Sequence, residues 1–302
     1  MKPDNSASVP SVCSDERIPY PIDWSLPVPD ENAHKYSRGK MVLVGGSAAY
    51  PGAACLAAWA SQYLGAGYTE VFTACENKPI VQSFRPSLVV RSFDKFSCEK
   101  LFSSDHPGAL VLGPGLETND NQAKSIFFDA LAFCEKPLLL DGGALSWAAE
   151  NQALVAQRSK RGFDTVLTPH TGEALRLAAS LDDVPRDPCE LALALSDWYN
   201  AAVVLKGSTT YVSWDKVTYD ITNGTAALAK AGTGDVLAGV IGALLAQGKH
   251  IFSAGVLGAT LHAEAGVVAS EQLGIISVCA EEVISALPDV LQDWQEEDFW
   301  YV

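Results

Sequence analysis

The residues with the clearest chemical potential form the segment Ala231-Gly232-Thr233-Gly234-Asp235, which precedes an apolar run. Glycines free backbone N–H groups to converge on one point, and the N-terminus of a following helix adds positive potential. The segment therefore predicts an anion hole built from Gly232, Thr233 and Gly234. Asp235 falls in the first helical turn, where the helix dipole favours a carboxylate. A plainer interpretation is that Thr233 or Asp235 only caps the helix after a glycine turn.

A second polar segment, residues 168–173, reads Thr-Pro-His-Thr-Gly-Glu and follows a short apolar run. Pro169 fixes the direction in which the chain leaves that run. His170 could hydrogen-bond a substrate, and Glu173 could orient a hydrated Mg²⁺ ion, which dehydrates reluctantly. The alternative is structural, with His170 capping the next helix and Glu173 serving as an ordinary first-turn acid.

Three further side chains have a chemical and a structural interpretation. Asp141 follows an apolar run and is either a turn residue or a substrate contact. Lys206 ends another run and either meets phosphate or is solvated. His262 lies within an apolar helical pattern, Ala259–Gly266, which favours a core histidine whose hydrogen bonds are satisfied.

Missing motifs narrow the chemistry. No GxxxxGK[ST] segment occurs, which excludes a P-loop NTPase. The glycines between Gly45 and Gly52 lack GxGxxG spacing, which disfavours a Rossmann dinucleotide loop. The five histidines are dispersed and no HExxH occurs, so a transition metal held by protein ligands is disfavoured.

Short continuous apolar runs must position these residues. Such runs are typical of strands buried on both faces of a parallel sheet, and they alternate with helical patterns. The predicted strands are Met41–Val44, Val71–Ala74, Ala109–Leu112, Pro137–Leu140, Thr165–Leu167 and Ala202–Leu205. The predicted helices are Ala53–Leu64, Asp235–Gln247, about Ser253–Gln272 and about Ala280–Trp294. Because ligands bind at the carboxyl ends of parallel strands, the loops GGS, GPG, DGG, TPH and KG are expected at one edge.

One segment alternates instead of running continuously. Thr209–Ser213 and Val217–Thr222 flank Asp215-Lys216, which predicts an antiparallel hairpin with a two-residue turn. Residues 1–33 are rich in Pro, Ser and Asp and predict an irregular arm, whereas residues 34–302 predict one doubly wound domain. Tyr20, Trp24 and Trp300 are expected to pack rather than to bind a ligand.

Composition bounds the function further. The 302 residues are 48% hydrophobic, which excludes disorder as the dominant state, and the net charge of −15 disfavours nucleic acid and anionic membranes as partners. The start of the chain has no apolar leader, and the longest apolar stretch, Val236–Ala246, is too short to span a bilayer. Seven scattered cysteines without a CxxC motif predict reduced thiols, buried at Cys55, Cys75 and Cys134, and a cytoplasmic protein.

Taken together, these motifs resemble the ribokinase-like superfamily and, within it, the ADP/ATP-dependent NAD(P)H-hydrate dehydratase family. The resemblance covers about Lys35 to Leu291 and implies a three-layer sandwich with a mostly parallel sheet and a small hairpin. The segments that carry it are Gly45-Gly46-Ser47 with Tyr50-Pro51-Gly52-Ala53, Gly113-Pro114-Gly115, Asp141-Gly142-Gly143-Ala144-Leu145, Thr168–Glu173, Lys206-Gly207 and Leu228–Gly239.

The resemblance implies a cofactor-repair reaction. Hydrated NADH or NADPH would be phosphorylated on its ring hydroxyl by ADP or ATP, with Mg²⁺, and phosphate would then be eliminated. Asp235 would take the hydroxyl proton, and the amides of residues 232–234 would stabilise the transferring phosphoryl group. The hydrated cofactor would be lined by Ala53, Gly115, Asp141, His170 and Asp235, and the nucleotide would be held by Lys206, Gly207, Ser208, Thr209, Thr210 and Gly234.

The sequence departs from the family pattern at three places. The family usually has Gly where Ala231 stands, Asn where Thr225 stands, and Asp-Ala-Asp where residues 141–143 are Asp-Gly-Gly. An alanine at 231 is strained if that position needs a positive φ, which puts nucleotide affinity in question. Many members also carry an epimerase domain, for which the first 35 or so residues are too few, so a separate epimerase is expected. Ala/Gly-rich helices favour a homo-oligomer.

Two alternative functions use the same residues. A vitamin-alcohol kinase of this fold would also need Asp235 but would release a stable phosphate ester, and such kinases usually carry Asn where His170 stands. A nucleotide-binding protein without turnover is supported only by Ala231 and Thr225.

Overall fold

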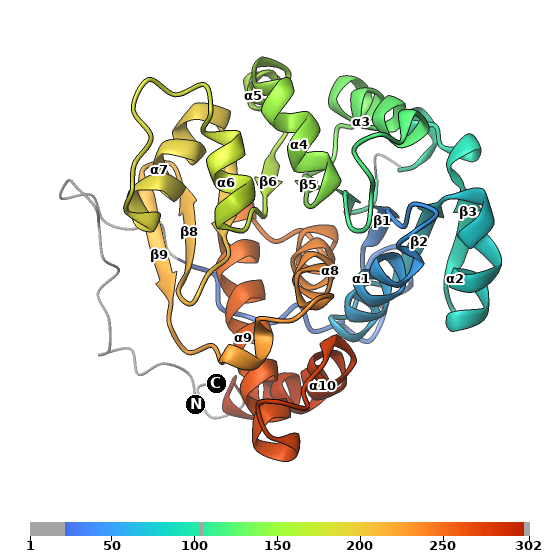
Figure 1. Cartoon of the computed structure of the whole chain (residues 1–302). Helices are drawn as coiled ribbons and strands as arrows, with labels where there is room; N and C mark the ends of the chain where they lie inside the picture. Colours follow the sequence, from blue (N-terminus) through green and yellow to red (C-terminus); the bar gives the residue numbers. More distant parts are fainter. Residues whose placement is uncertain (1–21, 103–104, 299–302) are drawn as a thin grey trace.

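The computed structural model describes residues 22–102 and 105–298. Its centre is a nine-stranded sheet in the order β3-β2-β1-β4-β5-β6-β7-β8-β9, sandwiched between two helical layers (Figure 1). Adjacent strands are parallel from β3 to β7, whereas β8 and β9 are antiparallel additions. The strands are β1 (Lys40–Val44), β2 (Tyr68–Thr73), β3 (Val89–Ser92), β4 (Gly108–Leu112), β5 (Leu138–Leu140), β6 (Thr165–Leu167), β7 (Ala202–Leu205), β8 (Thr210–Trp214) and β9 (Val217–Ile221).

Strands buried on both faces give the sheet two cores. In β1, Met41 and Leu43 enter one hydrophobic cluster, and Val42 and Val44 enter the other. The continuous apolar runs of the sequence are explained by this double burial, because alternate side chains point to opposite faces.

The helices divide between the two faces (Figure 1). One layer holds α1 (Pro51–Tyr63), α8 (Thr233–Ala246), α9 (Ile251–Leu273) and α10 (Ala280–Asp298). The other holds α3 (Asn121–Phe133), α4 (Gly143–Glu150), α5 (Gln152–Lys160), α6 (Thr171–Leu177) and α7 (Pro188–Tyr199). Helix α2 (Lys78–Phe84) leads into the edge strand β3.

The predicted strands, hairpin and four helices are confirmed, with bounds that differ by a few residues. The hairpin turns at Asp215 and Lys216, whose φ values of 44° and 66° suit a two-residue turn. Strand β3 was not predicted. It has only four residues, one of them the exposed Arg91, so it lacks a continuous apolar run.

Helix α8 is apolar on all sides because it lies between the sheet, α1 and α9. A Cβ at Gly239 would lie 2.2 Å from the Ala57 carbonyl oxygen, and a Cβ at Gly242 would lie 2.3 Å from Val111. The small residues expected to pack between subunits therefore serve packing inside the chain, and they give no support to an oligomer.

One helix among the described residues, α9, is long and apolar enough to cross a membrane. Its apolar window is 83% buried inside the fold, so we assign it to the core of the protein. The segment Val236–Ala246, read from the sequence as the longest apolar stretch, lies within α8 and is also buried.

Residues 22–33 contain neither helix nor strand, and Ile22, Trp24 and Leu26 pack against the hydrophobic core. Trp24 packs against Tyr219 and Trp294, as expected for a structural aromatic residue. Tyr20, Trp300 and Cys13 lie outside the described residues. Cys55 and Cys134 are buried thiols as predicted, but Cys75 is exposed at the start of a 3₁₀ turn, which corrects its assignment to the core.

Candidate active site

The loops after β1 and β4 meet where the chain order of the sheet reverses direction. The Gly46 N–H donates to the Pro114 carbonyl at 2.9 Å, and the Ser47 N–H donates to the Gly115 carbonyl at 2.8 Å. Crevices at such switch points are the usual ligand sites of open α/β sheets. The predicted convergence of GGS and GPG is therefore confirmed.

Two substrate candidates touch at this junction. Gly115 has a φ of +65°, and a Cβ there would lie 2.6 Å from the Ala53 Cβ. Gly113, with a φ of +134°, approaches the backbone of Asp141 so closely that a Cβ would lie 1.7 Å from its carbonyl oxygen. Glycines thus let the loops after β1, β4 and β5 pack together.

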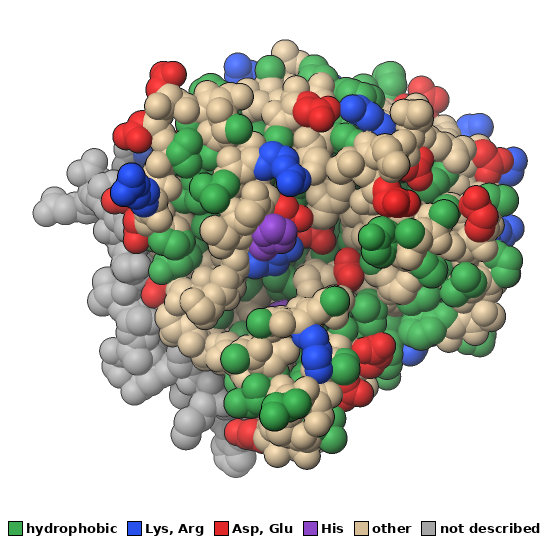
Figure 2. Space-filling model, viewed as in Figure 1, with side chains coloured by type: hydrophobic (Ala, Val, Ile, Leu, Met, Phe, Trp, Pro, Cys, Tyr) green, Lys and Arg blue, Asp and Glu red, His purple; other side chains and the backbone are tan. Residues whose placement is uncertain are grey.

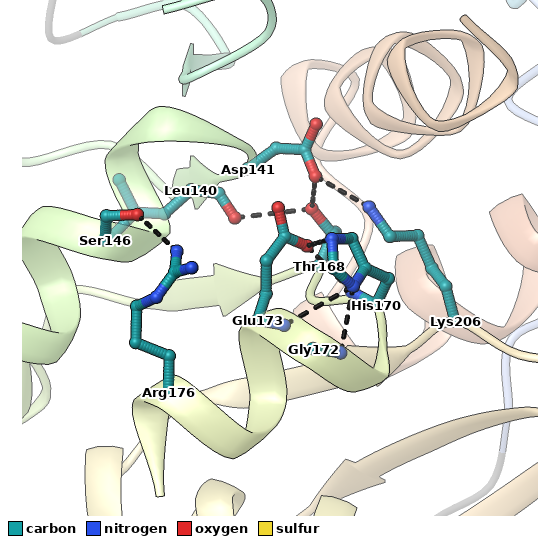
Figure 3. A network of polar contacts seen from close by, with 9 residues as sticks. All are labelled: Leu140, Asp141, Ser146, Thr168, His170, Gly172, Glu173, Arg176 and Lys206. Atoms are coloured by element: carbon teal, nitrogen blue, oxygen red, sulfur yellow. Dashed lines mark hydrogen bonds and ion pairs between the residues drawn. The ribbon is translucent and has the colours of Figure 1, made fainter. Parts of the chain in front are cut away.

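Asp141 is the centre of a polar network (Figure 3). Its Oδ1 accepts hydrogen bonds from the Thr168 hydroxyl at 2.8 Å and from the Lys206 ammonium at 2.9 Å. The Asp141 side chain is 5% exposed and that of Lys206 is 20% exposed. The interpretation of Lys206 as a solvated lysine is therefore wrong, because it forms a largely buried ion pair.

Asp235 lies in the first turn of α8, beside this pair. Burial, and secondarily the carboxylate of Asp141, raises the pKa of Asp235 to about 7, against the lowering effect of Lys206. Burial lowers the pKa of Lys206, but Asp141, Glu173 and Asp235 together hold it above its usual value. A carboxylate whose pKa is close to 7, beside a charged ammonium, is suited to accept a proton.

The loop before Asp235 is rich in glycine and is braced by Thr233. Gly232 is the N-cap of α8, with a φ of +94° and no side chain, so the interpretation of Thr233 or Asp235 as the cap is wrong. The Thr233 hydroxyl instead lies 2.7 Å from the Leu228 carbonyl and 2.9 Å from that of Lys230, which braces the loop. A Cβ at Gly234 would approach Lys206 Nζ at 3.5 Å. Gly234, in the first turn of α8, therefore lies beside the lysine end of the network.

His170 and Glu173 form a capping box at the start of α6. The His170 Nδ1 accepts N–H bonds from Gly172 and Glu173, and a Glu173 carboxylate oxygen accepts the His170 N–H at 2.8 Å. The structural interpretation of both residues is thus confirmed. The imidazole of His170 is nevertheless 61% exposed and lines the adjoining cavity, so capping leaves it available to a ligand.

A cavity of about 770 Å³ opens beside this network. Histidine, basic and acidic side chains gather around a hollow on this face of the molecule (Figure 2). The predicted nucleotide residues that line the cavity are Lys206, Gly207, Ser208, Thr210 and Gly234. Thr209 is not among its lining residues, and its carbonyl oxygen faces Gly207.

Residues 41–289 match the family model described as NAD(P)H-hydrate dehydratase. The chain belongs to the NAD(P)H-hydrate dehydratase family. It is 35% identical over 250 residues to a Neisseria meningitidis protein named ADP-dependent (S)-NAD(P)H-hydrate dehydratase, covering 81% of this chain and 82% of that protein. A bifunctional NAD(P)H-hydrate repair enzyme of Coxiella burnetii is 33% identical over 291 residues. The match covers 92% of this chain but only 56% of that relative, so the chain spans about half its length.

Solved structures show the same architecture. The ADP/ATP-dependent NAD(P)H-hydrate dehydratase of Bacillus subtilis, co-crystallised with ATP and Mg²⁺, has a TM-score of 0.76 and 26% identity, covering 89% of this chain and 94% of that one. A ribokinase-like superfamily protein of Enterococcus faecalis has a TM-score of 0.73 and 24% identity, covering 93% of this chain and 99% of the other. The predicted ribokinase-like fold is confirmed.

The departures from the NAD(P)H-hydrate dehydratase pattern have local explanations. Ala231 is not among the described residues with positive φ, so the strain considered for it is absent. A Cβ at Gly143 would lie 2.3 Å from the Leu116 carbonyl, so this chain needs glycine there. Thr225 caps a 3₁₀ turn by accepting the Ala227 N–H at 3.3 Å.

Sequence reasoning missed one candidate residue of this family member. His262 is buried as predicted, but it also lines the cavity, and its Nε2 has no hydrogen-bond partner. The expectation of a satisfied core histidine is therefore wrong. The sequence around His262 is apolar and gives no sign of a cavity. In the structure, the loop of residues 224–234 and the face of α9 that carries His262 line the same cavity.

Proposed function

We propose that this protein returns hydrated NADH and NADPH to NAD(P)H at the expense of ADP or ATP, as a carbon–oxygen lyase. The observation that carries the proposal is Asp235, a partly buried carboxylate with a pKa raised to about 7, at the glycine-rich start of α8 and beside Lys206. Family membership supports it, since relatives bear the name of this activity.

In the first step, Asp235 accepts the proton of the ring hydroxyl as that oxygen attacks the terminal phosphoryl group of the nucleotide. The new O–P bond forms while the bond to the bridging phosphate oxygen breaks, and the shortened nucleotide leaves. Phosphoryl transfer needs positioning and charge stabilisation, which the amides of residues 232–234 would supply. In the second step, the ring C–O bond breaks, phosphate departs with the bonding electrons, and loss of a ring proton restores the double bond.

The two ligands are assigned to adjoining parts of the site. Ala53 and Gly115 at the loop junction, with Asp141 and His170, would contact the hydrated cofactor. The nucleotide would be held by Lys206, Gly207, Ser208, Thr209, Thr210 and Gly234, which line the cavity except for Thr209. Lys206 would place its positive charge between the two ligands, because it is held by Asp141 at 2.9 Å.

Mg²⁺ fits this donor set as an ion held mainly by the nucleotide. Among the described residues, no group of three His, Cys, Asp or Glu side chains is placed to hold a metal. Mg²⁺ commonly keeps its waters and binds substrate phosphates, so a single carboxylate such as Glu173, acting through water, is sufficient. Bound there, the ion would neutralise charge on the phosphates.

We also propose the extent of the catalytic domain, its location in the cell and its assembly. Residues 34–302 would form one catalytic domain that works in the cytoplasm, with an epimerase as a partner activity. The bifunctional relative, which extends beyond the matched region, supports the pairing of two repair activities. A homo-oligomer is the proposed assembly, with the exposed Ile275 and Ile276 as candidate contacts. Light scattering of the purified protein tests it, and a monomer mass at all concentrations would contradict it.

Phosphorus NMR of a reaction containing hydrated NADH, Mg²⁺ and ADP or ATP tests the proposed chemistry. The expected products are inorganic phosphate and the shortened nucleotide in equal amounts. In a parallel reaction with a vitamin alcohol in place of hydrated NADH, accumulation of a stable phosphate ester would favour the kinase alternative instead. Nucleotide binding without any phosphate transfer would favour a binding protein.

A further inference from the structure

Lys230 lies in the loop before α8 and is one of the residues that line the 770 Å³ cavity. Its ammonium bonds to protein atoms. Nζ donates to the Val278 carbonyl at 2.6 Å and to the Ile276 carbonyl at 3.1 Å, and it lies 3.5 Å from the Cys279 sulfur. These partners are 46 to 49 residues away in the sequence, in the segment that joins α9 to α10. The side chain of Lys230 therefore joins two loops.

The segment that accepts these bonds is anchored in the core. Val278 is buried, and so is Ala280, the first residue of α10. The Cys279 N–H donates to a Glu282 carboxylate oxygen at 2.8 Å, and the Cys279 carbonyl accepts the Val283 N–H at 3.3 Å. The start of α10 is thus a fixed point to which the lysine is attached.

The other end of this connection is the start of α8. The Lys230 carbonyl accepts the Thr233 hydroxyl at 2.9 Å. Gly232, the N-cap of α8, packs against the same anchored segment, since a Cβ added there would lie 3.0 Å from the Ala280 Cβ. The loop that carries residues 232–234 is therefore attached to the start of α10 at two points, of which the Lys230 ammonium is the polar one.

The bonds of Lys230 also limit what it can do itself. An ammonium has three N–H donors, and two carbonyls and a thiol take one each. We propose that Lys230 is a positioning residue, which holds residues 232–234 ready for the nucleotide phosphates by joining their loop to the start of α10. This inference rests on the proposed function, which assigns residues 232–234 to phosphate.

The proposed connection has a consequence at its far end, because coupling between two sites is reciprocal. If the lysine connection favours nucleotide binding, bound nucleotide must stabilise the connection by the same free energy. Residues 274–279 would then open less often when nucleotide is bound, although they do not line the cavity. Amide hydrogen exchange measures local opening of this kind.

Hydrogen exchange of residues 274–279, measured by mass spectrometry with and without saturating ADP, tests the connection. K230M removes the ammonium, and K230R keeps a positive charge and several donors. K124M is the control variant, because Lys124 is paired with Glu150 at 3.0 Å and does not line the cavity. Calorimetric titration gives the ADP affinity of each protein.

We expect K230M to bind ADP about 10-fold more weakly, the typical effect of one hydrogen bond. By reciprocity, ADP should slow exchange of residues 274–279 by a similar factor in the unsubstituted protein and in K124M, in part in K230R, and not in K230M.

Three results would overturn the inference and leave the proposed function intact. The first is weaker ADP binding by K230M with the slowing retained, which would show that Lys230 acts by its charge on the phosphates. The others are unchanged affinity in K230M, and no slowing by bound ADP in the unsubstituted protein. No ADP binding by the unsubstituted protein would overturn the proposed function as well.

Discussion

Asp141 Oδ1 lies 2.9 Å from Lys206 Nζ, and this largely buried ion pair sets the charge around Asp235. Asp141 raises the pKa of Asp235 and Lys206 lowers it, with burial as the largest effect. The carboxylate that we propose as the base is thus tuned by two residues that come from different strand ends, after β5 and β7.

Replacing the base should separate binding from turnover. D235N removes the proton acceptor while keeping its shape, so turnover should fall by about 10²- to 10⁴-fold. Nucleotide binding should change little, since the glycine loop and Lys206 remain. Steady-state rates together with calorimetric titration check both points. If D235N lost as much ADP affinity as turnover, Asp235 would not act in the chemical step alone.

The same variant should make the protein more stable in alkaline solution. The pKa of Asp235 is about 7 in the folded state and 3.8 as the ordinary value, so the folded state holds a proton that the unfolded state releases between these pH values. Stability therefore declines as the pH rises through this window, and the buried charge is fully present above pH 7. The Tm of D235N should exceed that of the unsubstituted protein at pH 8, with a smaller difference at pH 5. Equal Tm differences at pH 8 and pH 5 would show that the pKa of Asp235 is not raised in the folded state.

The pH profile should depend on Asp141. A base with a pKa of about 7 makes kcat/KM fall as the pH drops below neutrality. D141N removes the negative charge that raises this pKa, so the acid limb should move to lower pH, whatever its effect on the maximal rate. If D141N only lowers the maximal kcat/KM and leaves the acid limb of the pH profile unmoved, that limb reports the titration of another group.

Breaking the ion pair from the lysine side should be costly. K206M leaves Asp141, which is 5% exposed, without its charged partner. Removing one partner of a buried pair typically costs about 3–5 kcal/mol of stability. Denaturant unfolding of K206M, D141N and the double variant checks this, and the double variant should lose less than the two single changes added together. Strict additivity would indicate that the pair does not couple.

Glycines inside helices give a matched test of packing. Gly239 in α8 meets the Ala57 carbonyl of α1, so G239A should destabilise the protein by about 1–3 kcal/mol. Gly52 in α1 has nothing within 4 Å of an added Cβ, so G52A should be neutral or stabilise by about 0.5–1 kcal/mol. The check is to measure the denaturant midpoints of G239A and G52A side by side. A similar loss of stability in both variants would contradict the packing described for Gly239.

Much of the fold was predictable because buried parallel strands leave continuous apolar runs, as at Met41–Val44 and Ala202–Leu205. The loops at the strand ends were predictable from glycine and proline. Side-chain partners were not, since Lys206 and Asp141 are 65 residues apart and meet only through the order of the strands. The place of His262 on the cavity wall was equally hidden, because an apolar helix looks the same in sequence whether its face meets a core or a cavity.

The most direct test of the central claim mixes the purified protein with hydrated NADH, Mg²⁺ and either ADP or ATP, and follows the absorbance of the dihydronicotinamide ring. A rise that depends on one nucleotide, and that D235N abolishes, is the result predicted here, and it also identifies the phosphate donor. No rise with either nucleotide, from protein that nucleotide still protects against heat, would contradict the assignment.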